Sequence, residues 1–137
     1  MDHEQLSQLV QAASAAKTRA MAPYSGFHVG AAIRTPQGRI YSGNNIEVSS
    51  YSLTICAERL ALFKALSEGE QAFEAIAVAT DSEAFCPPCG ACRQVLMDFT
   101  PDITVILVNV QGQTRALPLR ALLPEAFTSD FLDRHHD

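Results

Sequence analysis

The sequence predicts an α/β fold: a three-layer α/β/α sandwich in which helices cover both faces of a mixed five-stranded sheet. The chain has 137 residues and is 47% hydrophobic, which suits one domain over residues 1–137 with a substantial core. Helical and strand-like periodicities follow one another in the order αββαβαββ, which favours a sheet with helices packed against it. No internal repeat, low-complexity run or linker divides the chain.

The first half of the chain predicts a helix, a hairpin and a second helix. Apolar residues recur at near-helical spacing until Pro23, and from Phe27 larger apolar residues alternate with smaller or more polar ones. A proline–glycine turn joins two short strands, and a polar loop over 43–52 follows them. The second helix is apolar on nearly every side, so we expect it to be central and buried. The expected elements are a helix over 4–21, strands over 27–33 and 40–42, and a helix over 54–66.

The second half predicts three strands and two helices. A short apolar run, AIAVAT at 75–80, is typical of an inner strand. Pro88 can precede a helix but cannot lie inside one, so a helix is expected from Cys89 to Phe99. A β-branched run at 104–110 predicts the next strand, and a Gln-Gly turn leads to a short strand at 115–117 and a brief helix at 119–123.

Charge and hydropathy exclude several classes of partner. The chain carries 10 Lys+Arg against 15 Asp+Glu, a formal charge of −5, and lacks the clustered cations that bind polynucleotides. No apolar run approaches the ~20 residues that span a bilayer, and the opening MDHEQLSQLV is acidic rather than basic, unlike a secretory signal. We therefore expect a cytoplasmic protein with a small-molecule substrate, with no membrane and no nucleic acid polymer as partner.

The cysteines predict a metal site. Cys89 and Cys92 lie three residues apart at the start of one expected helix, so both thiols can face one point. Cys56 falls in the first turn of the other central helix, and two helix N-termini aimed at one point favour thiolates. A lone cysteine is more often a buried apolar residue, but this joint pattern is typical of Zn²⁺. Three protein ligands leave one position open, as in catalytic zinc sites.

Glu58 is the expected catalytic base. It follows Cys56 by two residues, and at the mouth of a helix both side chains can lean toward a metal beyond the helix end. A carboxylate in that position can remove a proton from a water bound at the metal. Taken alone, Glu58 would instead be interpreted as a carboxylate that the helix dipole favours.

Arg59 is expected to support the metal ligands. Three thiolates and Zn²⁺ sum to a charge of −1, which makes bound water harder to ionise. Arg59 lies three residues after Cys56 and can donate a hydrogen bond to its sulfur, which offsets that charge. The alternative is an ordinary ion-pair residue at the surface.

Cys86 and the histidines do not fit this pattern. Cys86 and Cys89 form a C-x-x-C pair that could be redox-active, or Cys86 could be a fourth ligand that closes a structural site. His3 and His28 show no ligand spacing to the cysteines, and His135 and His136 lie in a polar tail. We assign the histidines no role.

Taken together, the motifs resemble the small cytidine deaminases of nucleoside salvage. The zinc deaminase signature includes P-C-x-x-C and a Cys₃ variant. The resemblance covers nearly the whole chain, and asparagine is common in the family where this chain has Val48. The matching segments are PYSGFHVGAAI at 23–33, NNIE at 44–47, SYSLTICAERLAL at 50–62, PCGACRQVL at 88–96 and LLPEAF at 122–127.

The resemblance implies zinc-dependent hydrolytic deamination of cytidine and deoxycytidine to uridine and deoxyuridine, with release of ammonia. Zinc held by the three cysteines would activate a water for attack on C4 of the base, and Glu58 would shuttle the protons. The backbone of Ala57 would touch the base and Phe27 would line its pocket. Asn45 and Glu47 would hold the ribose hydroxyls.

The family resemblance also implies a homotetramer with shared active sites, in which Tyr51 and Phe127 reach into an adjoining subunit. Two other functions stay open. The first is a related deaminase that acts on a modified cytidine or on another amino-heterocycle, such as a blasticidin-like antibiotic. The second is a non-catalytic module stabilised by zinc, although such a site has no use for the carboxylate of Glu58.

Overall fold

The structure, a computed structural model, describes residues 1–132, so His135 and His136 lie outside the described residues. Within this range five strands form one sheet in the order β2-β1-β3-β4-β5. Only the central pair, β3 and β4, is parallel, and the outer pairs are antiparallel. The strands are β1 (Val29–Arg34), β2 (Ile40–Asn44), β3 (Ala75–Thr80), β4 (Thr104–Val108) and β5 (Thr114–Pro118).

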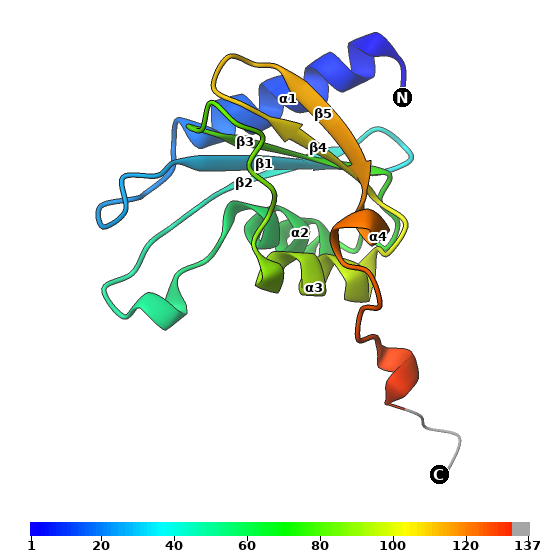
Figure 1. Cartoon of the computed structure of the whole chain (residues 1–137). Helices are drawn as coiled ribbons and strands as arrows, with labels where there is room; N and C mark the ends of the chain where they lie inside the picture. Colours follow the sequence, from blue (N-terminus) through cyan, green and yellow to red (C-terminus); the bar gives the residue numbers. More distant parts are fainter. Residues whose placement is uncertain (133–137) are drawn as a thin grey trace.

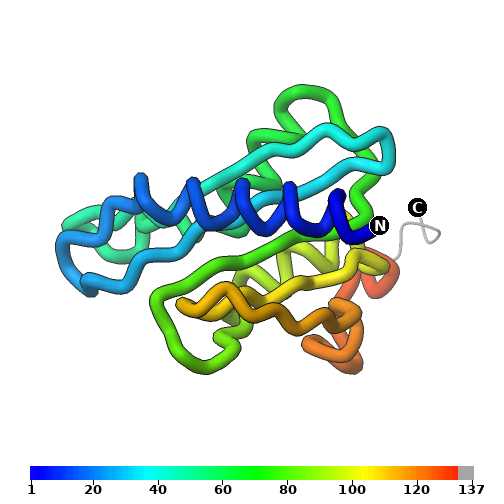
Figure 2. The backbone as a smooth tube through the Cα atoms, turned by 90° about the horizontal axis from the view of Figure 1, so that it is seen from above, coloured from blue at the N-terminus to red at the C-terminus, as the bar shows by residue number. Residues whose placement is uncertain are grey.

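Helices cover both faces of this sheet, and the predicted three-layer fold is confirmed (Figure 1). Helix α1 lies along one face, over the strands near the centre of the sheet, as the view from above shows (Figure 2). Helices α2 and α3 pack side by side on the other face (Figure 1). The helical segments are α1 (His3–Lys17), η1 (Tyr51–Leu53), α2 (Ala57–Ser67), α3 (Gly90–Phe99), α4 (Leu119–Leu122) and η2 (Ser129–Phe131). None of the helices in the described part of the chain is long and apolar enough to span a bilayer.

Each face of the sheet has its own apolar core. Beneath α1, Leu9 and Ala13 pack on small strand residues such as Ala77. Beneath α2 and α3, larger side chains such as Leu62 and Leu96 fill the interior. The flat, alanine-rich face therefore brings α1 close to the sheet, whereas the opposite face holds the thicker part of the core.

Gly43 on β2 allows α2 to pack closely on the sheet. A Cβ atom at this position would lie 2.6 Å from the carbonyl oxygen of Ala57 and 2.6 Å from the amide nitrogen of Ala61. Any residue other than glycine would push the helix away, because real Cβ atoms do not approach backbone so closely. Gly43 thus lets the first turn of α2 rest directly on the sheet.

Several predicted boundaries are wrong, and long-range pairing explains them. The first helix ends at Lys17 rather than Met21, because Met21 forms a bridge with Ile46. The second predicted helix begins at Ala57 rather than Thr54, because Ile55 forms a bridge with Ile46. Strands β1 and β4 are also shorter than predicted, with β1 beginning at Val29 and β4 ending at Val108.

Candidate active site

Three thiols gather at the N-termini of α2 and α3. Cys56 and Cys89 are the N-cap residues of these helices, and Cys92 lies buried in the first turn of α3. Cys56 is therefore the residue before the helix, and the prediction that it lies in the first turn is wrong. The Sγ atom of Cys89 lies 3.9 Å from that of Cys56 and 3.5 Å from that of Cys92, and all three sulfurs lie within 4.8 Å of one another.

These separations fit a metal site better than a disulfide. A tetrahedral zinc with Zn–S bonds of about 2.3 Å holds its sulfur ligands roughly 3.8 Å apart. A disulfide needs about 2.05 Å between the sulfurs, and all four cysteines are free. The three cysteines could therefore hold a metal ion.

The charges around Cys56 favour a thiolate. Its pKa is lowered to about 5, first by a hydrogen bond from Cys92 and then by Arg59. The pKa of Cys92 is raised in turn, chiefly because its thiol donates to the Cys56 sulfur. Arg59 donates from Nη2 to Cys56 Sγ over 3.2 Å, and this bond raises the pKa of the guanidinium. The contact expected for Arg59 is thus present.

Glu58 is a buried carboxyl group beside the thiols. It is only 5% exposed, and burial raises its pKa to about 7. Its side chain lines the same cavity as Cys56 and Cys89. A carboxyl group that titrates near neutral pH can both accept and return a proton during one reaction cycle.

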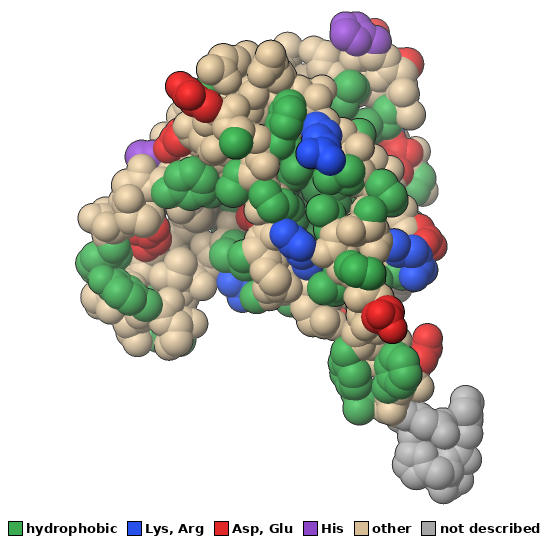
Figure 3. Space-filling model, in the orientation of Figure 1, with side chains coloured by type: hydrophobic (Ala, Val, Ile, Leu, Met, Phe, Trp, Pro, Cys, Tyr) green, Lys and Arg blue, Asp and Glu red, His purple; other side chains and the backbone are tan. Residues whose placement is uncertain are grey.

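The cavity in front of these groups has a volume of about 330 Å³. It opens on the face seen in Figure 3, where the surface is hollowed between the loop that carries η1, at the left, and the body of the molecule. Its apolar lining includes Phe27, Val29, Ile55, Ala57 and Val78. Such a volume and such walls suit a flat ring of the size found in small metabolites.

Asn45 and Glu47 form a polar part of the cavity, and both are already engaged in hydrogen bonds. Asn45 donates from Nδ2 to the Phe27 carbonyl and accepts from the Val29 amide, so it holds the wall of the cavity. Glu47 accepts hydrogen bonds from the amides of Tyr24 and Ser25 and from the Ser25 hydroxyl. The Ser25 hydroxyl is the largest influence that lowers the pKa of Glu47, which therefore carries a negative charge.

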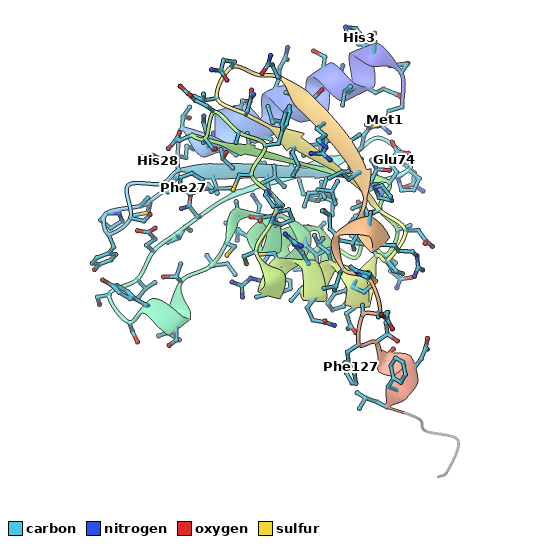
Figure 4. The ribbon with its side chains drawn as sticks, viewed as in Figure 1. Met1, His3, Phe27, His28, Glu74 and Phe127 are labelled. Carbon is cyan, nitrogen blue, oxygen red and sulfur yellow. The ribbon has the colours of Figure 1, made fainter. Side chains whose placement is uncertain are left out.

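Tyr51 and Phe127 do not line this cavity. Tyr51 is 71% exposed on η1 and contacts the edge of the Tyr24 ring. Phe127 is also exposed and stacks on Phe131. Figure 4 shows Phe127 on the C-terminal segment, on the side of the molecule away from Phe27. Tyr51 instead lines a neighbouring pocket that shares Ser25, Glu47 and Thr54 with this cavity.

Sequence reasoning missed several residues of the cavity. Ser25 orders Glu47 and lies in the matching segment 23–33, but no role was predicted for it. Thr80 lines the wall at the end of β3 and belongs to none of the matching segments. Cys86 also lines the cavity, although its sulfur lies outside the cluster of three thiols. Val48 does not line the cavity, and its amide donates to the Thr54 hydroxyl in the loop before α2.

Comparisons with known proteins agree with this geometry. The family described as "Cytidine and deoxycytidylate deaminase zinc-binding region" matches residues 3–108. A cytidine deaminase of Halalkalibacterium halodurans is 49% identical over 123 residues, which covers 89% of this chain and 93% of the relative. One of Sporosarcina psychrophila is 44% identical over 128 residues, with 93% and 94% covered.

A more distant relative and a solved structure extend these matches. A blasticidin-S deaminase of Bacillus cereus is 35% identical over 109 residues, covering 74% of this chain and 77% of the relative. The crystal structure of a cytidine deaminase from Burkholderia pseudomallei superposes with a TM-score of 0.86 at 46% identity, covering 93% of this chain and 100% of the other. The matched region is zinc-binding and the three cysteines could hold a metal ion, which confirms the predicted cofactor. On this evidence, the chain belongs to the cytidine and deoxycytidylate deaminase zinc-binding family.

Proposed function

We propose that this protein deaminates cytidine and deoxycytidine hydrolytically, in pyrimidine salvage in the cytoplasm, with one Zn²⁺ per subunit held by Cys56, Cys89 and Cys92. The observation that carries the proposal is the buried Glu58 carboxyl group, which lines a cavity of about 330 Å³ beside the three thiols. A purely structural zinc site has no use for such a group. The relatives named cytidine deaminase support the same reaction.

In the proposed mechanism, bound zinc supplies the Lewis acidity that lets water ionise near neutral pH. Glu58 accepts one proton from the attacking water and passes it to N3 of the base. It then accepts the second proton of the same oxygen, now bonded to C4, and passes it to the departing amino group. The C4–N bond breaks and a C4–O bond forms, so cytidine and water become uridine and ammonia. Arg59 stabilises the thiolate of Cys56 throughout.

The remaining cavity residues hold the substrate in this proposal. Phe27 and Ala57 both line the cavity, and in this proposal Phe27 packs against the base while the backbone of Ala57 hydrogen-bonds it. Glu47 and Asn45 offer oxygen and amide groups to the sugar hydroxyls. No Lys or Arg lines the cavity in the described part of the chain, and Glu47 is ionised, so a 5′-phosphate would be repelled. We therefore expect deoxycytidine to be preferred over its 5′-monophosphate.

The deciding experiment follows the ultraviolet absorbance of cytidine with wild type and with Glu58→Gln. The amide has the shape of the carboxyl group but cannot carry the proton, so kcat should fall by about 10²–10⁴ while the zinc content stays unchanged. Glu68→Gln is the control, because Glu68 is exposed at the other end of the same helix.

Other outcomes favour other functions. If zinc-loaded wild type leaves cytidine unchanged, an amino-heterocycle such as blasticidin S becomes the better substrate, as the Bacillus cereus relative suggests. Normal turnover by Glu58→Gln would exclude the proposed mechanism. Failure of the wild type to bind zinc would contradict both the enzyme and the zinc-stabilised module.

We also propose that the protein is a homotetramer with shared sites. Tyr51 and Phe127 are exposed and lie outside their own cavity, which suits side chains that reach a neighbouring subunit. Activity should then be lost when the assembly dissociates on dilution, as measured by light scattering and turnover on the same samples. Full activity in a demonstrated monomer would contradict the shared site.

A further inference from the structure

Asp81 directly follows Thr80, the last residue of β3 and part of the cavity wall. The last ladder pair between β3 and β1 joins Thr80 to Val29, so Asp81 stands one residue beyond the ladder. Its Oδ2 atom accepts a hydrogen bond from the backbone amide of His28 at 2.9 Å and lies 2.9 Å from His28 Nδ1. The backbone pairing of β1 with β3 thus ends at Val29, and the Asp81 side chain binds the next amide, that of His28.

The segment that Asp81 holds is a wall of the cavity. His28 stands between Phe27 and Val29, both of which line the cavity, and Figure 4 shows His28 beside Phe27. From β2's side, Asn45 bonds the Phe27 carbonyl at 2.8 Å and the Val29 amide at 2.9 Å. Successive backbone groups of residues 27–29 are therefore held by side chains from two different parts of the chain.

Lys17 anchors this arrangement to α1. Its Nζ atom lies 3.4 Å from Asp81 Oδ1 and donates to the Thr80 carbonyl at 3.3 Å. Partial burial acts to raise the pKa of Asp81, but the hydrogen bonds from His28 and Lys17 lower it overall, so the carboxylate is ionised. Charge-assisted bonds of this kind are stronger than neutral ones and hold their partners in a defined geometry.

We infer that Asp81 is a positioning residue, which holds the wall of residues 27–29 in the shape that binds the nucleoside and so sets substrate affinity without taking part in the chemical step. The inference rests on the proposed function for its kinetic consequence. Its structural part, the tethering of the His28 amide, stands independently of the substrate.

The kinetic test compares Asp81→Ala, Asp81→Asn and the wild type with cytidine. Loss of the carboxylate frees the wall in both the ground state and the transition state, so KM should rise about tenfold, equivalent to about 1.4 kcal/mol, with kcat changed less than about twofold. Asp81→Asn keeps an oxygen acceptor for the His28 amide and should restore most of the affinity. Asp102→Ala is the matched control. It also removes an aspartate from an ion pair, but the partner, Arg120, does not line the cavity.

Hydrogen–deuterium exchange supplies the second measurement and needs no turnover. The His28 amide should exchange faster in Asp81→Ala than in wild type or Asp102→Ala, while amides in the middle of β3 stay protected. Should Asp81→Ala fail to fold, Lys17→Met removes the anchor but keeps the carboxylate, and must raise KM in the same direction.

The outcomes separate the two ideas. If the wild type does not deaminate cytidine, the proposed function fails, and exchange at His28 still tests the tether. A lower melting temperature with unchanged KM and unchanged His28 exchange would overturn the inference, because Asp81 would then serve stability alone. A fall in kcat at constant KM would overturn it as well.

Discussion

The helices of this protein begin in two different ways. Helix α1 starts with a complete capping box, in which Asp2 accepts from the Gln5 amide and the Gln5 side chain accepts from the Asp2 amide. Helices α2 and α3 start with Cys56 and Cys89, and neither side chain makes a capping hydrogen bond. The α1 start is closed by its own side chains, whereas the other two face the thiol cluster and the cavity.

The difference indicates that α2 and α3 lack the stabilising caps of α1 at the ends where the thiols lie. Cysteine is not among the preferred N-cap residues, and replacing a good cap costs about 1 kcal/mol per helix. In return, two positive helix ends and three thiols converge on one point, which favours thiolates and metal binding. Metal binding to the folded chain can offset the lost caps, because any ligand that binds only the native state stabilises it.

The largest effect should come from Cys89→Ser, which turns an open helix start into a capped one. Serine is a good N-cap but a poor zinc ligand, so zinc and activity should both be lost. In the presence of a chelator, however, the variant should melt no lower than the wild type. Metal analysis and thermal unfolding with and without chelator measure both effects. Retention of stoichiometric zinc by Cys89→Ser would contradict the assignment of Cys89 as a metal ligand.

Arg59→Ala should have the next largest effect. The variant should keep its zinc, because all three thiols remain, but turnover should fall about 10–100-fold as the charge on Cys56 is no longer offset. Steady-state kinetics with a zinc determination on the same sample measures this. Arg59→Lys tests whether charge alone suffices, and an unchanged rate in Arg59→Ala would remove the charge argument.

Asp2→Ala probes the closed helix start. Loss of the capping box should lower the free energy of unfolding by about 1 kcal/mol, while kcat and KM for cytidine stay as in wild type. Denaturant unfolding of the zinc-loaded protein, followed by circular dichroism, gives the value. A change in kcat would show that the start of α1 is coupled to the active site, and would contradict the view that this helix start serves stability alone.

Cys86→Ser should have the smallest effect. Its sulfur contacts the Pro87 carbonyl and lies outside the thiol cluster, so zinc and activity should both be retained. Burial raises the pKa of Cys86, so its thiol is neutral and a hydroxyl can replace it. Loss of zinc from this variant would mean that four cysteines bind the metal and would overturn the open site.

Local patterns predicted most elements of the fold but not their ends. The strand at 75–80 was predicted to the residue, because its apolar run is bounded by polar sequence. The first helix was extended to Met21 because its apolar spacing continues past Lys17, and only the bridge from Met21 to Ile46 ends it. Such a bridge joins distant segments and leaves no periodic trace in either one.

The candidate site divides in the same way. Cys56, Glu58 and the C-x-x-C pair could be found from sequence, because their chemistry requires fixed residue types at short spacing. Asp81 and Ser25 could not be found, because each acts by a hydrogen bond to a residue more than 20 positions away. Aspartate and serine are common in loops, so neither residue indicates its role until the fold brings it to its hydrogen-bond partner.

The sequence by itself determined the α/β fold, the three thiols, the carboxyl group of Glu58 and the resemblance to the deaminases, since these follow from short-range spacing and residue chemistry. Only the tertiary structure decided that α2 rests on Gly43, that Cys56 is the residue before its helix, and that Asp81 and Asn45 hold the wall of residues 27–29. The physical reason is that pairing and close packing depend on three-dimensional distance, which separation along the chain does not determine.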